Sequence, residues 1–482
     1  MNGTAISGIP FILAIPVIAA AILAILPGYR SAASLNVAAA FLTLLAALSL
    51  LLQKPAPGPY ILVDDLNIVF VILNTFVGFT TSAFSASYIA HELETGRLTP
   101  DYLRFYHAMY QMLLFAMNLA LVANNIGLMW VAIEMATLTT VIMVGIYRTE
   151  EAIEAAWKYF ILGSVGIALA LFGTILVYMA ARPVVGEGID GMVWTVLRER
   201  AGSFDPALLN LAFVFLLLGY GTKAGLAPLH AWLPDAHAEG PTPISAVLSG
   251  LLLNVALYAV LRFKLLLAVN PAAIAPGPLM AAMGLGSVLF ASFMLYRRSD
   301  IKQMFGYSSI EHMGIIAFAF GMGGPLANFA GLLHMTMHSL TKSAIFFTVG
   351  HIAQAKGTQN TADIRGLTVT HPALGWGLVL GMIAIAGMPP LGIFMSEFLV
   401  VSSTFARMPL LAIPLVAGLL IGFGALFLRL QEFAFGEPKG SQTPVKASYM
   451  PMASHLGLVL TAGVYLPPPL VTWFQNVARL LG

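Results

Sequence analysis

Long apolar runs recur along the whole of this chain, and they restrict it to one kind of fold. Each run has about the 20 residues that an α-helix needs to cross the hydrocarbon core of a bilayer, and several contain a glycine or a proline. The sequence therefore predicts an all-α polytopic membrane protein with about 14 transmembrane helices. The predicted spans lie near residues 5–27, 33–52, 66–90, 108–124, 126–147, 157–180, 208–229, 242–264, 276–296, 303–323, 326–353, 372–404, 408–430 and 453–475.

The composition supports this class and narrows the chemistry. Of the residues, 59% are hydrophobic and only 9% are charged, far outside the range of soluble domains. The chain contains no cysteine, which excludes disulfides and cysteine-ligated iron–sulfur or nickel–iron centres. It lacks a glycine-rich phosphate loop, and its net charge of +2 is too small to indicate a nucleic-acid partner. We therefore expect no cofactor, and any redox chemistry must belong to partner subunits.

The basic residues predict an orientation in the membrane. Lysine and arginine are more frequent in the loops after odd-numbered spans than in the other loops. Because cytoplasmic loops are enriched in these residues, the bias places the odd-numbered loops in the cytoplasm and both termini on the outer (periplasmic) side of the inner membrane. No lysine or arginine precedes Arg30 and the first apolar run is long, so we do not expect a cleaved signal peptide.

Lys223 is the only formally charged residue in the apolar run from Asn210 to Leu229. A lysine at membrane depth costs roughly 2.5–3.5 kcal/mol on insertion scales, so it needs a partner, a wet cavity or a function. Gly225 and Pro228 follow it and loosen the helical hydrogen-bond ladder, which can free backbone carbonyls to line a wet cavity. A lysine beside a helix break within the membrane indicates ion handling.

Other titratable residues also lie within or at the edge of apolar spans. A single buried residue of this kind often only pairs two helices together, but a set spread over several spans favours a polar path for protons. The set comprises Glu134, Lys158, His312, His334, His338, Lys342 and Glu397.

Glu134 and Lys158 each have two interpretations. Glu134 is either a protonated carboxyl bonded to a neighbouring threonine or the partner of a lysine on another helix. Two charges about 4 Å apart at an effective dielectric constant of 20 attract each other by roughly 4 kcal/mol, so moving Glu134 would switch Lys223 between holding and releasing a proton. Lys158 is more ambiguous, because Glu154 precedes it by one helical turn and such residues form ordinary ion pairs.

His334, His338 and Lys342 are spaced by four residues and therefore lie near one helix face. Two histidines at this spacing can ligate a metal ion, but no carboxylate or cysteine accompanies them in their span, and the following lysine would repel a cation. We therefore predict no metal site. Imidazole titrates near neutral pH, so the stripe is better interpreted as a route for protons, which His312 could continue.

Glu397 follows a second break, at Pro389 and Pro390, in the second half of the chain. Lys223 and Glu397 thus each lie beside a disrupted apolar helix. Corresponding interrupted helices are typical of transporters built from inverted repeats. The two segments share almost no identity, so the repeat is predicted from the pattern alone.

The segment T-K-A-G-L-A-P-L-H-A-W-L-P-D-A-H-A-E-G-P-T-P-I-S-A-V-L-S-G (222–250) resembles the signature of the antiporter-like subunits of respiratory complex I and membrane-bound hydrogenases. Shorter segments resemble the same family in the same order along the chain. They are K-Y-F-I-L-G-S (158–164), Y-S-S-I-E-H-M-G (307–314), H-S-L-T-K-S-A-I-F-F (338–347) and G-M-P-P-L-G-I-F-M-S-E-F (387–398).

The resemblance implies a fold of 14 helices with two inverted five-helix repeats, in which helices 7 and 12 are broken. The implied domains are helices 1–3 (1–105), a first repeat of helices 4–8 (106–265), a second repeat of helices 9–13 (266–435), and a C-terminal loop with helix 14 (436–482). It also implies proton translocation driven by electron transfer in a peripheral arm, with iron–sulfur, nickel–iron or NADH-linked partner subunits.

The resemblance also assigns residues. Glu134 matches the family's helix 5 glutamate, Lys223 its helix 7 lysine, and His338 and Lys342 its helix 11 stretch. Glu397 matches the helix 12 position that is glutamate in M-type subunits, which makes this an M-like member.

Asn254 departs from the pattern, because family members usually carry a lysine there in helix 8. Asparagine hydrogen-bonds water but carries no proton at pH 7. Either water bridges from Lys223 toward His312 and Lys342, or the subunit pumps poorly or not at all. With the segment Y-R-T-E-E-A-I-E-A-A-W-K-Y-F-I-L-G-S, the departure favours the component F type of hydrogenase-4 complexes over a quinone-linked complex I subunit.

The leading interpretation is a proton-translocating membrane subunit of an oxidoreductase, without catalytic residues or a redox centre of its own. The predicted relay is Glu134, Lys223, His312, His338, Lys342 and Glu397, with Lys158, His334 and Asn254 as further candidates. Two alternatives stay open: a cation/proton antiporter subunit without redox coupling, and a scaffold that has lost pumping.

Overall fold

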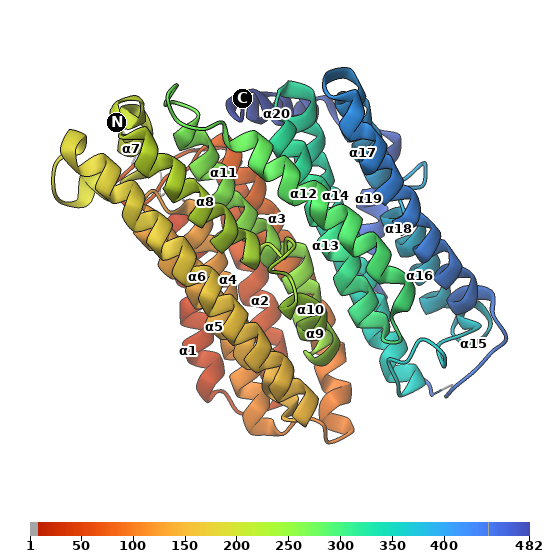
Figure 1. The fold of residues 1–482 in the computed structure, drawn as a ribbon. Helices are drawn as coiled ribbons and strands as arrows, with labels where there is room; N and C mark the ends of the chain where they lie inside the picture. Colours follow the sequence, from red (N-terminus) through yellow and green to blue (C-terminus); the bar gives the residue numbers. More distant parts are fainter. Residues whose placement is uncertain (1–7, 442) are drawn as a thin grey trace.

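The computed structural model describes residues 8–441 and 443–482, and these residues form a bundle of helices (Figure 1). No β-strand occurs among them, which agrees with the need of a lipid-embedded chain to satisfy its backbone hydrogen bonds internally. The helices are α1 (Ile9–Ile25), α2 (Tyr29–Leu48), α3 (Asp65–Glu94), α4 (Pro100–Val122), α5 (Ile126–Val144), α6 (Glu150–Val185), α7 (Trp194–Arg200), α8 (Pro206–Lys223), α9 (Trp232–Glu239), α10 (Thr242–Val247), α11 (Leu253–Leu267), α12 (Pro276–Met294), α13 (Ile301–Met322), α14 (Pro325–Lys356), α15 (Leu367–Thr370), α16 (Pro372–Ile385), α17 (Gly392–Arg407), α18 (Pro409–Phe435), α19 (Tyr449–Val464) and α20 (Pro468–Leu480).

The described part of the chain contains nine helices that are long and apolar enough to cross a bilayer. One of them, Thr242–Leu267, joins α10 to α11 through a π-helical turn. The helices α1 and α16 are apolar but shorter. An all-helical protein with several membrane spans is therefore confirmed.

Two apolar spans leave the helical conformation at the breaks that the sequence predicts. One helix ends at Lys223 and the other at Ile385, and in each case several residues precede the next helix. Gly225 and Gly387 have φ of 73° and 68° in these breaks, a left-handed conformation that glycine adopts without a steric penalty. The breaks place polar backbone and titratable side chains inside the bundle.

The long helix α14 runs through the second half of the bundle (Figure 1). It packs against α3, α10, α13, α16, α17, α19 and α20. Close packing elsewhere relies on small residues: a Cβ on Gly219 of α8 would lie 2.5 Å from the backbone nitrogen of Ala170 in α6. Small residues let helix backbones approach one another in this way within a membrane.

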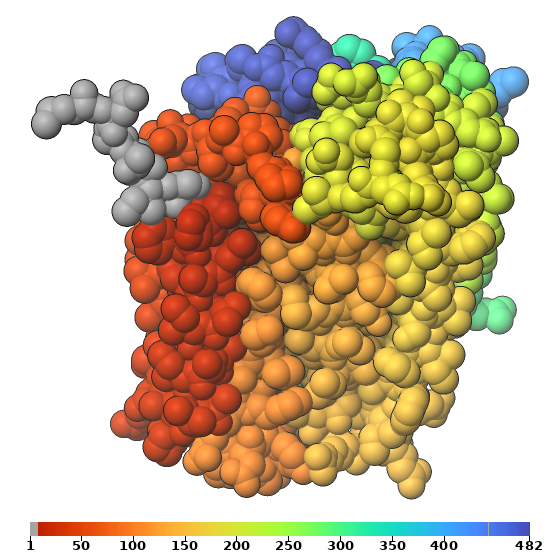
Figure 2. Space-filling view, turned by 90° about the vertical axis from the view of Figure 1, so that its left-hand side faces the viewer, coloured from red at the N-terminus to blue at the C-terminus, as the bar shows by residue number. Residues whose placement is uncertain are grey.

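One side of the molecule shows the N-terminal helices in red, orange segments across its middle and α6 in yellow (Figure 2). The helices α1, α2 and α6 expose large apolar side chains, including Ile18, Phe41, Trp157 and Ile175. Exposed apolar side chains on long apolar helices suit contact with lipid or with another membrane subunit.

The last predicted span, near 453–475, is not one straight helix. The helices α19 and α20 meet at 82°, because Pro467, Pro468 and Pro469 cannot continue the helical ladder. The second piece, α20, lies across one end of the bundle (Figure 1). There Asn328 donates to the carbonyl of Ala478 at 3.1 Å, which ties the end of the chain to α14.

Arg262 lies in α11 and is buried within the protein. The guanidinium donates to both carboxylate oxygens of Asp64, at 2.7 and 2.9 Å, and to the hydroxyl of Tyr258 at 2.7 Å. Asp64 is also the N-cap of α3, where its side chain accepts from the backbone of Asn67. This bidentate pair joins α3 to α11 at the edge of the membrane-spanning region.

Candidate functional site

Lys223 is the last residue of α8, and its ammonium group lies inside the protein with 1% of its side chain exposed. The Nζ atom lies 3.7 Å from Oε2 of Glu134 in α5 and donates a hydrogen bond of 2.8 Å to the hydroxyl of Thr137. The ring of Tyr159 in α6 lies below it, 5.8 Å from Nζ. The structure thus brings together the lysine and the glutamate that the sequence proposes as a pair.

The break after Lys223 is held in place by Trp232 at the start of α9. Its indole Nε1 donates to the backbone carbonyl of Thr222 at 2.9 Å, and its ring stacks on Tyr159 with 4.2 Å between ring centroids. The chain therefore folds back beneath the lysine. A carbonyl that loses its partner at the helix end is satisfied by a side chain, as helix termini require.

Gly163 provides the space that the lysine occupies. A Cβ at this position of α6 would lie 2.7 Å from Lys223 Nζ. A larger residue would therefore displace the ammonium group, and the flexible lysine side chain could move without breaking the packing of the helices.

Gly163→Ala should consequently lower proton translocation several-fold while the subunit still assembles. The added methyl moves the ammonium away from Glu134 and Thr137, so the pair no longer holds its geometry. Electron-driven proton movement in vesicles, measured beside subunit content, checks this. Gly286→Ala is the matched control, since a Cβ there has nothing within 4 Å. Equal translocation by the two variants would contradict the role given to Gly163.

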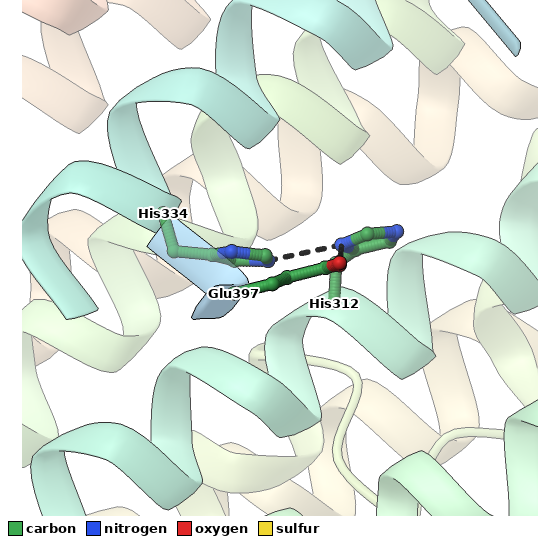
Figure 3. Close-up of side chains that lie close together, drawn as sticks. All are labelled: His312, His334 and Glu397. Atoms are coloured by element: carbon green, nitrogen blue, oxygen red, sulfur yellow. Dashed lines mark hydrogen bonds and ion pairs between the residues drawn. The ribbon is translucent and has the colours of Figure 1, made fainter. Parts of the chain in front are cut away.

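A second cluster of titratable side chains lies where α13, α14 and α17 meet (Figure 3). Nδ1 of His312 and Nε2 of His334 are 2.9 Å apart, and Nδ1 of His312 lies 4.0 Å from Oε1 of Glu397. Nδ1 of His334 contacts the hydroxyl of Ser396 at 2.9 Å. His334, only a further candidate from its sequence, is therefore a central member of this cluster.

His338 and Lys342 continue from this cluster along α14. The ring of His338 stacks on that of His312, with centroids 5.5 Å apart, and neither of its nitrogens has a hydrogen-bond partner among the described residues. Lys342 is fully buried, and its Nζ donates to the carbonyl of Phe305 at 2.5 Å. Buried donors without partners are uncommon and need water or a function.

Asn254 lies in α11, where its side chain contacts α14. Its amide nitrogen donates to the carbonyl of Gly250 at 3.0 Å and to the hydroxyl of Ser339 at 2.7 Å, and its amide oxygen has no partner among the described residues. Ser339 directly follows His338 in the chain. Asn254 thus links α11 to α14, next to His338, through a neutral polar contact.

Lys158 does not join either cluster. Its Nζ lies 2.5 Å from Asp235 and 3.8 Å from Glu154, and 38% of its side chain is exposed. Asp235 in turn accepts from the amide of Gln303 at 2.9 Å. The ordinary pairing of Lys158 with Glu154 is therefore present, together with a partner in α9 that the spacing alone does not indicate.

Glu311 and His237 are buried titratable residues that the sequence prediction of the site does not include. Glu311, the neighbour of His312 in the sequence, turns toward α12 and accepts from the hydroxyl of Ser292 at 2.9 Å. His237 of α9 stacks on Phe346, with centroids 4.9 Å apart, and neither of its nitrogens has a hydrogen-bond partner in the described part of the chain. The only available signal for His237 was its place in the recognised 222–250 segment.

Residues 123–422 match the protein family described as "NADH:quinone oxidoreductase/Mrp antiporter, TM". A protein of Methylacidiphilum infernorum (isolate V4), described as a hydrogenase-4 component F homolog, is 63% identical over 98% of this chain and 99% of its own length.

Solved structures share the fold. A chain of the membrane-bound sulfane sulfur reductase, an archaeal respiratory membrane complex, has a TM-score of 0.87 at 22% identity, over 99% of this chain and 98% of that one. A chain of respiratory complex I from Thermus thermophilus has a TM-score of 0.81 at 23% identity, over 98% of this chain and 100% of that one. The architecture is thus that of a multi-pass membrane subunit.

Proposed function

The chain belongs to the NADH:quinone oxidoreductase/Mrp antiporter family, and from this premise we propose that it is a proton-translocating membrane subunit of a multi-subunit respiratory oxidoreductase. The observation that carries the proposal is the pair formed by the buried Lys223 and the partly buried Glu134 beside a helix break. A carboxylate near 4 Å stabilises the ammonium form by roughly 4 kcal/mol at an effective dielectric constant of 20. A small movement of either helix can therefore load or release a proton.

In this proposal Glu134 modulates Lys223, and Lys223 stores the proton. His312, His338 and Lys342 relay it. The packing of α14 supports this order. This helix carries His338 and Lys342, and it contacts α13, which carries His312, and α17, which carries Glu397. Asn254 and Ser339 supply the polar contact between the two clusters, where water would carry the proton that asparagine cannot.

Glu397 is the proposed gate at the end of this path. Its side chain is 15% exposed, against 2% for His312, so it is the member of the second cluster with access to the surroundings. It also follows the break between α16 and α17, where a change of backbone conformation can move the carboxylate toward or away from the histidines.

We further propose fourteen spans arranged as helices 1–3 (1–105), two inverted repeats (106–265 and 266–435) and a C-terminal part (436–482). The support is the pair of corresponding breaks, one after Lys223 and one before Gly392, which is the pattern of inverted-repeat transporters. The excess of basic residues in the odd-numbered loops supports both termini on the outer side of the inner membrane.

The proposed partners are other membrane-arm subunits and a peripheral arm with iron–sulfur, nickel–iron or NADH-linked subunits. The relative described as a hydrogenase-4 component F homolog supports a hydrogenase-type arm. The absence of cysteine supports the location of all redox centres in those partners.

An antiporter subunit without redox coupling is the second candidate, because the matched family also includes Mrp antiporters. Purification of the native complex separates the two functions. We expect co-purifying iron–sulfur proteins and proton movement across vesicle membranes that begins on addition of an electron donor. A complex of membrane subunits alone, exchanging cations for protons without a donor, would replace the first candidate with the second.

A further inference from the structure

The three side chains in Figure 3 converge on one point from three different helices. One ring nitrogen of His312, one of His334 and a carboxylate oxygen of Glu397 all lie within 4.8 Å of one another. The sequence separates Glu397 from the histidines by more than a span, so the carboxylate that the histidine stripe lacks within its own helix is supplied by α17.

The hydrogen bonds around His334 aim a lone pair at this point. The hydroxyl of Ser396 donates to the carbonyl of Ile393 at 2.8 Å, so toward His334 it can only accept. Nδ1 of His334 therefore carries the hydrogen, and Nε2 of the neutral ring offers its lone pair toward His312. A histidine whose outer nitrogen is held by such a bond is oriented as metal-ligating histidines are.

The distances suit a small transition-metal ion. Ligand atoms about 2.0–2.1 Å from a tetrahedral zinc ion are about 3.4 Å apart. The present separations of 2.9 Å between the histidine nitrogens and 4.0 Å from His312 to Glu397 lie on either side of that value. A small rotation of the Glu397 carboxylate and a slight separation of the rings would close the site.

The positive charge of Lys342 is one reason why the sequence predicts no metal site, but this lysine is distant from His312, His334 and Glu397. Lys342 follows His334 by eight residues, which corresponds to about 12 Å along a helix. Its ammonium is held by the carbonyl of Phe305, and the Glu397 carboxylate offsets part of the cation's charge.

We propose that His312, His334 and Glu397 form a binding site for one zinc ion, with a fourth position open to water. Two imidazole nitrogens and one carboxylate form a ligand set that zinc adopts in proteins, whereas Mg²⁺ and Ca²⁺ prefer sites made of oxygen atoms. On binding, the hydrogen of His312 moves from Nδ1 to Nε2, and Glu397 binds as the carboxylate.

The consequence for transport rests on the proposed function. The metal ion would occupy the lone pairs through which His312 and His334 exchange a proton, and it would hold Glu397 in place. Zinc bound here would therefore stop proton passage between the histidines and the gate. Binding itself does not depend on transport and is tested separately.

The full chain is purified in detergent, equilibrated with Zn²⁺ and washed, and its zinc content and zinc X-ray absorption spectrum are measured. We expect His334→Gln to retain one zinc ion fewer per chain than the unaltered protein. His334→Cys should retain it and add a sulfur ligand at about 2.3 Å, which is diagnostic because the chain has no cysteine of its own. An excess of Mg²⁺ should not displace the ion.

Four variants, compared with the unaltered chain, decide the matter. Equal zinc content in the unaltered chain and His334→Gln would overturn the proposal, and so would His334→Cys without a sulfur ligand. His371→Gln, which alters a histidine at the start of α16 outside the cluster, should leave the zinc content unchanged. Lys223→Met should also bind zinc normally, so a failure of the site and a failure of the proposed transport function would be told apart.

Discussion

Lys223→Met is expected to lower electron-driven proton translocation by the assembled complex by about tenfold or more. Methionine fills a similar volume but holds no proton, so the step between Glu134 and the histidine stripe is lost. The attraction of roughly 4 kcal/mol within such a pair corresponds to about three powers of ten in proton occupancy. The measurement is proton movement per electron in vesicles, with the content of this subunit determined in the same membranes.

Lys223→Arg tests whether translocation needs a proton that can be released or only a positive charge at this position. Arginine keeps the positive charge beside Glu134 but does not release its proton in proteins. We expect this variant to assemble and to fail in translocation as Lys223→Met does. Full translocation by Lys223→Met, in a normally assembled complex, would show that the subunit is a scaffold and that protons pass elsewhere.

Asp64→Ala is expected to destabilise the protein strongly. Arg262 is 2% exposed and both its outer nitrogens bind Asp64, so the substitution leaves a buried charge without a counter-ion, which costs about 3–5 kcal/mol. Loss of the N-cap of α3 adds about 1 kcal/mol. Thermal unfolding of the purified protein in detergent should begin at a clearly lower temperature.

Asp64→Asn is the matched control, because an asparagine side chain can still cap α3 but carries no charge. Its stability should lie between those of the unaltered protein and Asp64→Ala. If Asp64→Ala unfolded at the same temperature as the unaltered protein, the pair would contribute nothing to stability.

The pair of Asp64 and Arg262 makes the stability of the protein depend on pH. Burial by itself raises the pKa of the Asp64 carboxyl, but the charge and hydrogen bonds of Arg262 outweigh this and hold the pKa below its ordinary value. The stabilisation is therefore complete above the unfolded-state pKa of about 3.9 and is lost as the pH falls through the lower folded-state value. The difference in unfolding temperature between the unaltered protein and Asp64→Asn should shrink over this acidic range.

Some of the site could be predicted because a titratable residue in an apolar span is conspicuous. Lys223, Glu134 and Glu397 were identified in this way, and the structure brings the first two within 3.7 Å. Arg262 and Asp64 were not identified as a pair, because each stands near the end of a span, where charges are ordinary. Glu311 contacts Ser292 of α12 and does not join the cluster of its neighbour His312, because adjacent residues on a helix point in different directions.

The class of the protein, the helical breaks beside Lys223 and Glu397, and the titratable residues within the spans could all be predicted from the residues alone. These features follow from local chemistry, since hydrophobicity, glycine and proline act on the nearest few residues. Which of those residues meet depends on the packing of the helices. It placed Thr137 beside Lys223 and brought Glu397 to the pair of His312 and His334. Contacts between helices far apart in the chain depend on how their side chains pack together, and no single span contains that information.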